Sequence, residues 1–152
     1  MKRALLAGWL IVGTLDILEV MVFYFFYRDV PPIRILQSVA SGLLGSDAYQ
    51  GGVPTALLGL AVHFFIAFVV VAIYHFASRR LPVLVRHPVL MGTLYGLAVW
   101  VVMSYIVVPA SAFPGKGIPA GLLLANALFA HIFCIGIPTG LTAARSPLAH
   151  PS

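Results

Sequence analysis

Apolar residues fill four long stretches of this chain and leave the polar residues to the segments between them. The stretches run from about residue 4 to 27, 54 to 77, 88 to 108 and 119 to 143. A helix needs roughly 20 apolar residues to cross about 30 Å of hydrocarbon. Each stretch therefore predicts one transmembrane helix. Together they predict an all-α fold, a bundle of four transmembrane helices that forms a single integral membrane domain over residues 1–152.

The linker between the first two stretches carries a helical pattern of its own. Pro31-Pro32 can start a helix. Apolar residues then recur at helical spacing, at Ile33, Leu36, Val39 or Ala40, and Leu43. Polar residues alternate with them, at Arg34, Gln37, Ser38 and Ser41. We predict an amphipathic helix over about residues 32–44 that lies in the outer membrane interface or caps the bundle.

The two halves of the chain share landmarks in the same order. Gly13-Thr14-Leu15 in the first stretch recurs as Gly92-Thr93-Leu94 in the third, and a Val-Pro pair follows each at a similar distance. A lone histidine follows the start of the second and fourth stretches, at His63 and His131. The pattern predicts two similar hairpins related by a pseudo-two-fold axis along the membrane normal. Such an axis would bring the two histidines towards each other.

Composition and charge support a membrane location. Hydrophobic residues make up 61% of the chain and charged residues 9%, a far more apolar balance than a soluble domain has. The net charge of +5 does not predict nucleic-acid binding, because the basic residues lie at segment ends and form no stripe. Arg28, Arg34 and Lys116 fall on one side of the four spans. The other side holds Lys2, Arg3, Arg79, Arg80, Arg86 and Arg145. The positive-inside rule then places both termini in the cytoplasm.

Two glycine pairs and one proline predict how the last two spans pack. Gly92 and Gly96 in the third span, and Gly136 and Gly140 in the fourth, have the small-xxx-small spacing that lets helices approach closely. Pro138 lies inside the second pair and is expected to kink the fourth span. Outside these pairs, His75 at the end of the second span is expected to reach the membrane interface.

Four ionisable residues lie inside the apolar stretches, namely Asp16, Glu19, His63 and His131. A charged side chain near the bilayer centre costs about 2.5 to 3.5 kcal/mol or more, so each of them needs a polar partner. Their i,i+3 spacing puts Asp16 and Glu19 on one helix face. At 1.5 Å of rise per residue, all four lie within roughly 6 Å of one another in depth. We predict a shared polar layer near the middle of the bilayer.

The polar layer admits several uses. The four side chains can satisfy one another and neighbours such as Thr14 and Asn126, and so fix the packing of the helices. Alternatively, they can relay protons or ions. They can also bind a divalent metal, or His63 and His131 can ligate a haem from its two sides. The two histidines are thus the candidate cofactor ligands, although the sequence requires no cofactor.

The sequence lacks the motifs of soluble enzymes. It has no phosphate-binding loop, no HExxH and no nucleophile elbow. Cys134 is the only cysteine and cannot form a disulfide or a CxxC site within one chain. We therefore expect a non-enzymatic membrane protein, an accessory or stress-related component. The alternatives are a proton or ion relay or transporter, and a haem- or metal-binding electron carrier. Its partners would be the lipid bilayer and either a second copy or a larger membrane complex, with no nucleic acid.

Two segments resemble those of a group of bacterial four-span inner-membrane proteins whose function is not assigned. They are Val30 to Gly45 and His63-Phe64. More distantly, the chain resembles the YagU-type proteins of this class. The residues that carry this second likeness are Gly13, Glu19, Pro31-Pro32, Arg34, His63 and His131. The resemblance implies a bacterial inner-membrane location and a four-span architecture, and it implies no particular activity.

Overall fold

The computed structural model describes residues 2–115 and 117–145. Within these residues the chain is helical and has no β-strand. Four helices are long and apolar enough to cross a membrane: Lys2–Arg28, Gly52–Ser78, Pro88–Ala110 and Leu122–Ala144. The prediction of an all-helical chain with four long apolar helices is therefore confirmed. The remaining residues of the predicted single domain, 1, 116 and 146–152, lie outside the described part.

Two of the long helices are continuous and two change their winding. Helices α1 (Lys2–Arg28) and α3 (Gly52–Ser78) are α-helical throughout. The third comprises α5 (Pro88–Val102), the π-helical turn η2 (Met103–Val107) and α6 (Val108–Ala110). The fourth comprises α7 (Leu122–Phe129), the π-helical segment η3 (Ala130–Gly136) and α8 (Ile137–Ala144).

A proline follows each π-helical segment. Pro109 comes just after η2, and Pro138 just after η3. Proline has no N–H to donate, and its ring collides with the carbonyl group four residues earlier, so the regular α-helical ladder cannot continue through it. The helix accommodates the proline by widening for one or two turns. The distortion expected at Pro138 is thus present as π-helical winding.

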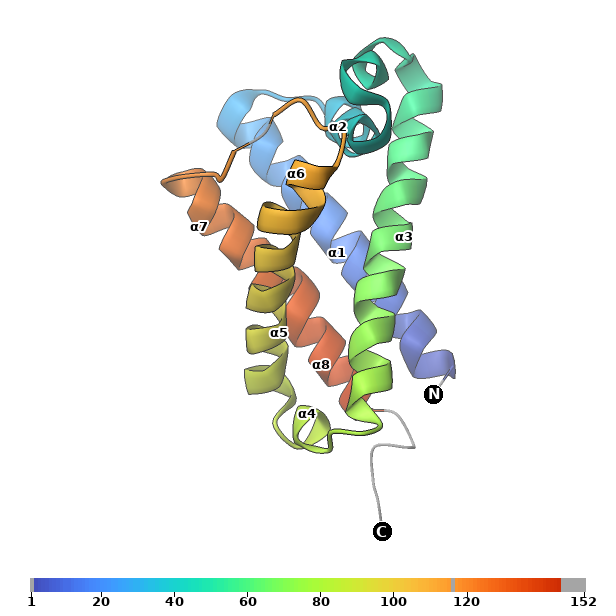
Figure 1. Ribbon diagram of the computed structural model, residues 1–152, viewed down its shortest axis with the longest axis vertical. Coiled ribbons are helices and arrows are strands. Elements are labelled where there is room, and N and C mark those ends of the chain that lie inside the picture. The colour runs from blue at the N-terminus through green and yellow to red at the C-terminus, as the bar shows by residue number, and fades with distance from the viewer. Residues whose placement is uncertain (1, 116, 146–152) are drawn as a thin grey trace.

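The long helices lie side by side, and the connections gather at the two ends of the molecule (Figure 1). Helix α1 packs on α3, while α5 packs on η3 and α8. The N-terminus and the short helix α4 (Val83–Arg86) lie at one end, called here the α4 end. Helix α2 (Pro32–Leu44) and the 3₁₀-helix η1 (Gly45–Gln50) lie at the opposite end, called the α2 end.

The glycine pairs bring the backbones of α5 and the fourth helix into direct contact, as predicted. A Cβ atom on Gly136 would lie 2.9 Å from the Cα of Gly96 and would overlap the carbonyl oxygen of Gly92. A Cβ atom on Gly140 would overlap the carbonyl oxygen of Pro88. Because no side chain separates the two helices, this contact has little room to adjust.

Helix α2 occupies the predicted residues but buries a different face. Leu43 is 61% exposed, and Ile33 is also exposed, whereas the polar residues Gln37 and Ser41 are buried. Gln37 donates from Nε2 to the carbonyl oxygen of Gly52, at 3.0 Å. The expected division into an apolar inner face and a polar outer face is therefore wrong for Gln37 and Ser41, since hydrogen bonding offsets the burial of an amide. The interfacial position of α2 stays a prediction.

Candidate functional site

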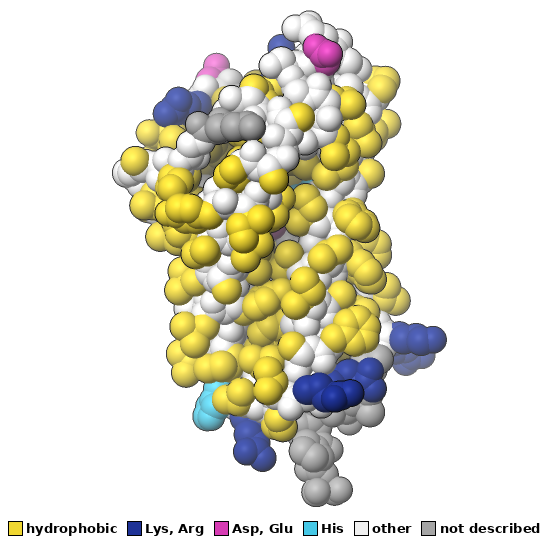
Figure 2. Space-filling model, viewed as in Figure 1, with side chains coloured by type: hydrophobic (Ala, Val, Ile, Leu, Met, Phe, Trp, Pro, Cys, Tyr) yellow, Lys and Arg dark blue, Asp and Glu magenta, His cyan; other side chains and the backbone are white. Residues whose placement is uncertain are grey.

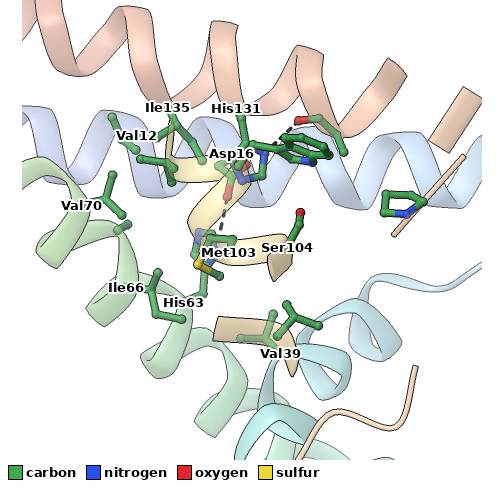
Figure 3. Close-up of a pocket in the computed structure, with 16 residues that line it drawn as sticks. Val12, Asp16, Val39, His63, Ile66, Val70, Met103, Ser104, His131 and Ile135 are labelled. Atoms are coloured by element: carbon green, nitrogen blue, oxygen red, sulfur yellow. Dashed lines mark hydrogen bonds and ion pairs between the residues drawn. The ribbon is translucent and has the colours of Figure 1, made fainter. Parts of the chain in front are cut away.

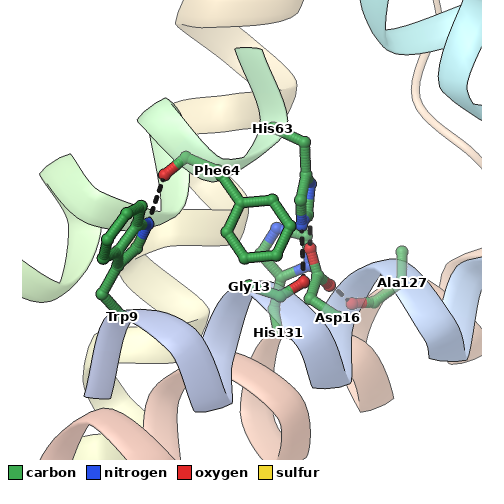
Figure 4. A network of polar contacts seen from close by, with 7 residues as sticks. All are labelled: Trp9, Gly13, Asp16, His63, Phe64, Ala127 and His131. Atoms are coloured by element: carbon green, nitrogen blue, oxygen red, sulfur yellow. Dashed lines mark hydrogen bonds and ion pairs between the residues drawn. The ribbon is translucent and has the colours of Figure 1, made fainter. Parts of the chain in front are cut away.

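Asp16 of α1 and His63 of α3 face each other in the interior of the helix assembly (Figure 4). The distance from His63 Nδ1 to Asp16 Oδ2 is 3.9 Å, and the two side chains are 11% and 20% exposed. The other ring nitrogen, His63 Nε2, lies 2.8 Å from the carbonyl oxygen of Gly13. The two predicted residues from different helices are thus brought together.

The hydrogen bond to Gly13 decides where the protons of this pair can be. A carbonyl oxygen only accepts, so His63 Nε2 must carry a hydrogen. In neutral His63 the lone pair of Nδ1 then faces the Asp16 carboxylate, and two unprotonated acceptors in this arrangement repel each other. One further proton removes the repulsion, either on His63 Nδ1 or on Asp16 Oδ2. At a separation of 3.9 Å, a proton on either group gives an attractive contact between them.

The packing of Phe64, the neighbour of His63, depends on the absence of a side chain at Gly13. A Cβ atom there would lie 2.6 Å from the ring of Phe64. The aromatic ring instead packs on the bare backbone of α1, next to the carbonyl group that His63 uses. Trp9 adds a second link between the same helices, because its indole N–H donates to the carbonyl oxygen of Phe64 at 2.7 Å.

His131 of η3 reaches the same place from the opposite side. Figure 3 shows Asp16 between the two imidazoles, and the carboxylate interacts electrostatically with both. His131 Nδ1 donates to the carbonyl oxygen of Ala127 in its own helix, at 2.8 Å. In its neutral form, His131 therefore keeps an unprotonated Nε2. No hydrogen bond within the described residues occupies this nitrogen, which makes it a second place for a proton.

Glu19, on the same helix, interacts electrostatically with Asp16. Its carboxyl group forms a side-chain hydrogen bond with Asn126 of α7. Its Oε2 atom is buried and has no hydrogen-bond partner among the described residues. Asp16 thus interacts with the two histidines on one side and with Glu19 along its own helix, and Glu19 in turn interacts with Asn126. Thr14, the other expected partner, lies on an exposed face of α1.

Asp16, His63 and His131 line a cavity of about 280 Å³. Its walls are otherwise mostly apolar and reach towards the α2 end at Val39 and Pro119. Trp100 and Ser104 of the third helix also line it. The indole nitrogen of Trp100 is buried and has no hydrogen-bond partner among the described residues. The volume suffices for several water molecules, which need polar partners of the kind these side chains offer.

A cluster of apolar side chains lies on the α4 side of this cavity. Val12, Val71 and Ile135 are buried and pack together as one hydrophobic cluster. Each lies on the α4 side of the polar group, since Val12 precedes Asp16 by one helical turn in α1. Val71 follows His63 by two turns in the antiparallel α3. This cluster therefore lies between the polar group and the α4 end.

The site has too few side chains for a metal centre, and the His63 nitrogen that a haem iron would need is already hydrogen-bonded. Among the described residues, no three His, Cys, Asp or Glu side chains come together as a metal centre would need. To ligate a haem iron through Nε2, His63 would have to release the Gly13 carbonyl oxygen.

The structure buries polar residues that the sequence did not place in the interior. His75 was expected to reach the membrane interface, but it is only 3% exposed, because α3 is covered there by α4 and α8. Its Nδ1 lies 3.0 Å from the carbonyl oxygen of Val71. Trp100 is a second such residue, and nothing in its sequence neighbourhood indicates an unpartnered N–H beside a cavity.

Comparison with known proteins finds no match, whether among family models, curated proteins or solved structures. The likeness to the four-span inner-membrane proteins therefore stays a prediction. The function has to be argued from the geometry of the Asp16 site alone.

Proposed function

We propose that this chain is a non-enzymatic, multi-pass membrane protein that relays protons through the Asp16–His63 pair. The observation that carries the proposal is the arrangement of His63, whose Nε2 is committed to the Gly13 carbonyl oxygen while Nδ1 faces the Asp16 carboxylate. One proton fits between these two groups and can leave again. Ionisable groups held at this depth in membrane helices commonly mark such relays.

The cavity provides the route on one side of the pair. Water molecules within it would connect Asp16 to the α2 end, past Ser104 and the free indole N–H of Trp100. His131 Nε2 is a second acceptor beside the same carboxylate. A proton arriving through the cavity would therefore bind between Asp16 Oδ2 and His63 Nδ1.

The apolar cluster makes the relay gated. A proton cannot cross the packed side chains of Val12, Val71 and Ile135, because hydrocarbon solvates no charge. Release to the α4 end requires these side chains to separate. Such a site would work by alternating access and would not act as an open proton channel.

The charge distribution supports an orientation for this relay. Basic side chains gather at the α4 end, whereas basic and acidic side chains occur together at the α2 end (Figure 2). We place the α4 end and both termini in the cytoplasm of a bacterial inner membrane, because short cytoplasmic loops carry the excess of Lys and Arg. The cavity would then open towards the periplasm. Lys116, which the sequence assigns to the periplasmic side, lies outside the described residues.

Proton flux into liposomes tests the relay. The purified full chain is reconstituted with a pH-sensitive dye inside, and a potassium gradient with valinomycin drives proton entry. Asp16→Asn keeps the shape of the side chain but removes the site of proton binding, so flux is expected to fall to the level of empty liposomes. Glu19→Gln is the matched control on the same helix and should retain flux, because Glu19 does not line the cavity.

A second function, a structural role in an accessory membrane component, is favoured by the hydrogen bond that ties His63 to α1. In that case the wild-type protein would show no flux above empty liposomes, and Asp16→Asn would change only the unfolding temperature. Equal flux in folded wild-type and Asp16→Asn protein would contradict the relay through Asp16.

A further inference from the structure

A second hollow lies at the α4 end, away from the Asp16 site. Its volume is about 590 Å³. Three basic residues line it, Lys2 and Arg3 from the start of α1 and Arg145 from the end of the fourth helix. The rest of its lining consists of Ala4, Ala7, Ile11 and Thr142. The hollow thus combines a cationic rim with an apolar floor.

The contact between α1 and α8 holds these basic residues together. Gly8 is buried, and a Cβ atom there would lie 2.7 Å from Thr142 Oγ1. The first turns of α1 therefore lie directly on α8. The Thr142 hydroxyl group donates to the carbonyl oxygens of Pro138 and Thr139, at 2.9 and 3.0 Å, within its own helix. The cations are consequently the main hydrogen-bond donors that the hollow offers to a ligand.

No acidic side chain balances the charge of this hollow. The chain has four Asp and Glu residues in all. Asp16 and Glu19 lie in the interior beside the relay site, while Asp29 and Asp47 follow α1 and belong to the α2 end. Three positive charges thus share one hollow without an Asp or Glu side chain beside them. An anion from outside would relieve their mutual repulsion.

The apolar floor continues along α1 from the charged rim towards the middle of the helix. Ala4, Ala7 and Ile11 are spaced to fall on one helix face. The two alanines leave space that longer side chains would fill, and Ile11 is exposed. A ligand that fits the whole hollow therefore needs an anionic head and a hydrocarbon chain that runs parallel to α1.

We propose that this hollow binds an anionic phospholipid. Its phosphate group lies among Lys2, Arg3 and Arg145, and one acyl chain follows the face of Ala4, Ala7 and Ile11. Guanidinium groups form paired, charge-assisted hydrogen bonds with phosphate oxygens. A zwitterionic headgroup binds more weakly, because its own ammonium group is repelled by the three basic side chains. Anionic lipids of the cytoplasmic leaflet are attracted to such basic clusters. This proposal does not depend on the relay.

Two triple variants separate this site from general attraction to the membrane. The first combines Lys2→Gln, Arg3→Gln and Arg145→Gln. The second combines Arg79→Gln, Arg80→Gln and Arg86→Gln, which removes the same charge from the same end but outside the hollow. Native mass spectrometry of the full chain from phosphatidylcholine nanodiscs that contain some phosphatidylglycerol measures how much phosphatidylglycerol stays bound.

The first triple variant is expected to retain on the order of tenfold less phosphatidylglycerol than the second. The variant Lys2→Arg keeps the charge and both guanidinium groups and should keep the lipid, while equal helix content of the two glutamine variants by circular dichroism shows that loss does not come from misfolding. Equal retention by the two glutamine variants would overturn the proposal. So would displacement of the lipid by millimolar inorganic phosphate, because the hollow would then recognise the phosphate ion alone.

Discussion

Two helix pairs, α1 with α3 and α5 with the fourth long helix, are held together in different ways. Helix α5 meets the fourth helix through glycine, backbone against backbone, at Gly92, Gly96 and Gly136. Helix α1 meets α3 through side chains, among them the His63 bond to Gly13 and the Asp16–His63 contact. The glycine of the repeated Gly-Thr-Leu therefore has two roles. Gly92 packs against a helix backbone, whereas Gly13 accepts a hydrogen bond beneath an aromatic ring.

The difference indicates which interface can move. Glycine contacts leave no freedom for side chains to rearrange, so α5 and the fourth helix form a rigid frame. Side-chain contacts have alternative rotamers, and polar ones change with protonation. The protonatable pair lies in the adjustable interface, where a proton can alter the contact between α1 and α3. A gate of Val12, Val71 and Ile135 would respond to movement there.

The largest expected effect comes from filling the glycine interface. Gly96→Leu places a side chain where its Cβ would already overlap the carbonyl oxygen of His131. We expect a loss of about 3 kcal/mol or more in the free energy of unfolding, or failure to fold, because backbone cannot move aside as a side chain can. Denaturation of the purified protein in mixed micelles measures it. Ala98→Leu, on an exposed face of the same helix, is the control and should change little.

Replacement of the two histidines is expected to have intermediate effects on the free energy of unfolding, larger for His63 than for His131. His63→Leu leaves Asp16 without its partner and the Gly13 carbonyl oxygen without its donor, which costs about 2 to 3 kcal/mol. His131→Leu removes a bond to a carbonyl group within the same helix and is expected to cost about 1 kcal/mol. Unfolding of both variants under identical conditions compares them. Equal destabilisation would show that the two helix pairs do not differ as described.

A substitution in the apolar cluster of Val12, Val71 and Ile135 is expected to have the smallest effect on stability but a clear effect on proton flux. Val71→Thr keeps the shape of a buried side chain but gives the apolar cluster a hydroxyl group that can hold water. We expect a destabilisation of about 1 kcal/mol and a faster proton leak in the liposome assay. Val69→Thr lies on an exposed face of the same helix and serves as the control. If both variants leave the leak unchanged, the apolar cluster is not the barrier.

Much of the fold could be predicted because membrane-spanning length is a local property. An uninterrupted apolar run long enough for a bilayer predicts a helix wherever it occurs, and the four long helices follow it. The helix at Pro32–Leu44 is equally local, since its proline start and its spacing lie in one short segment. The glycine contacts were also predictable, because small residues one turn apart leave the backbone accessible.

The partners of the polar residues were not predictable from their positions. The i,i+3 spacing of Asp16 and Glu19 gives them a common face of α1, but it says nothing about what each meets across the interface. Asp16 faces His63, while Glu19 bonds with Asn126. A small rotation of α1 about its axis would exchange these neighbours. That rotation depends on the packing of all the helices together.

Burial of polar side chains required the tertiary structure for the same reason. Gln37 appeared to belong to the outer face of its helix, and His75 to the membrane interface, because both are polar. Each is buried where a neighbouring carbonyl oxygen lies within hydrogen-bonding distance. The sequence by itself determined which residues form the long apolar helices and which ionisable residues lie within them. Only the tertiary structure decided which of them face each other, since contacts depend on distances across helices that are far apart in the chain.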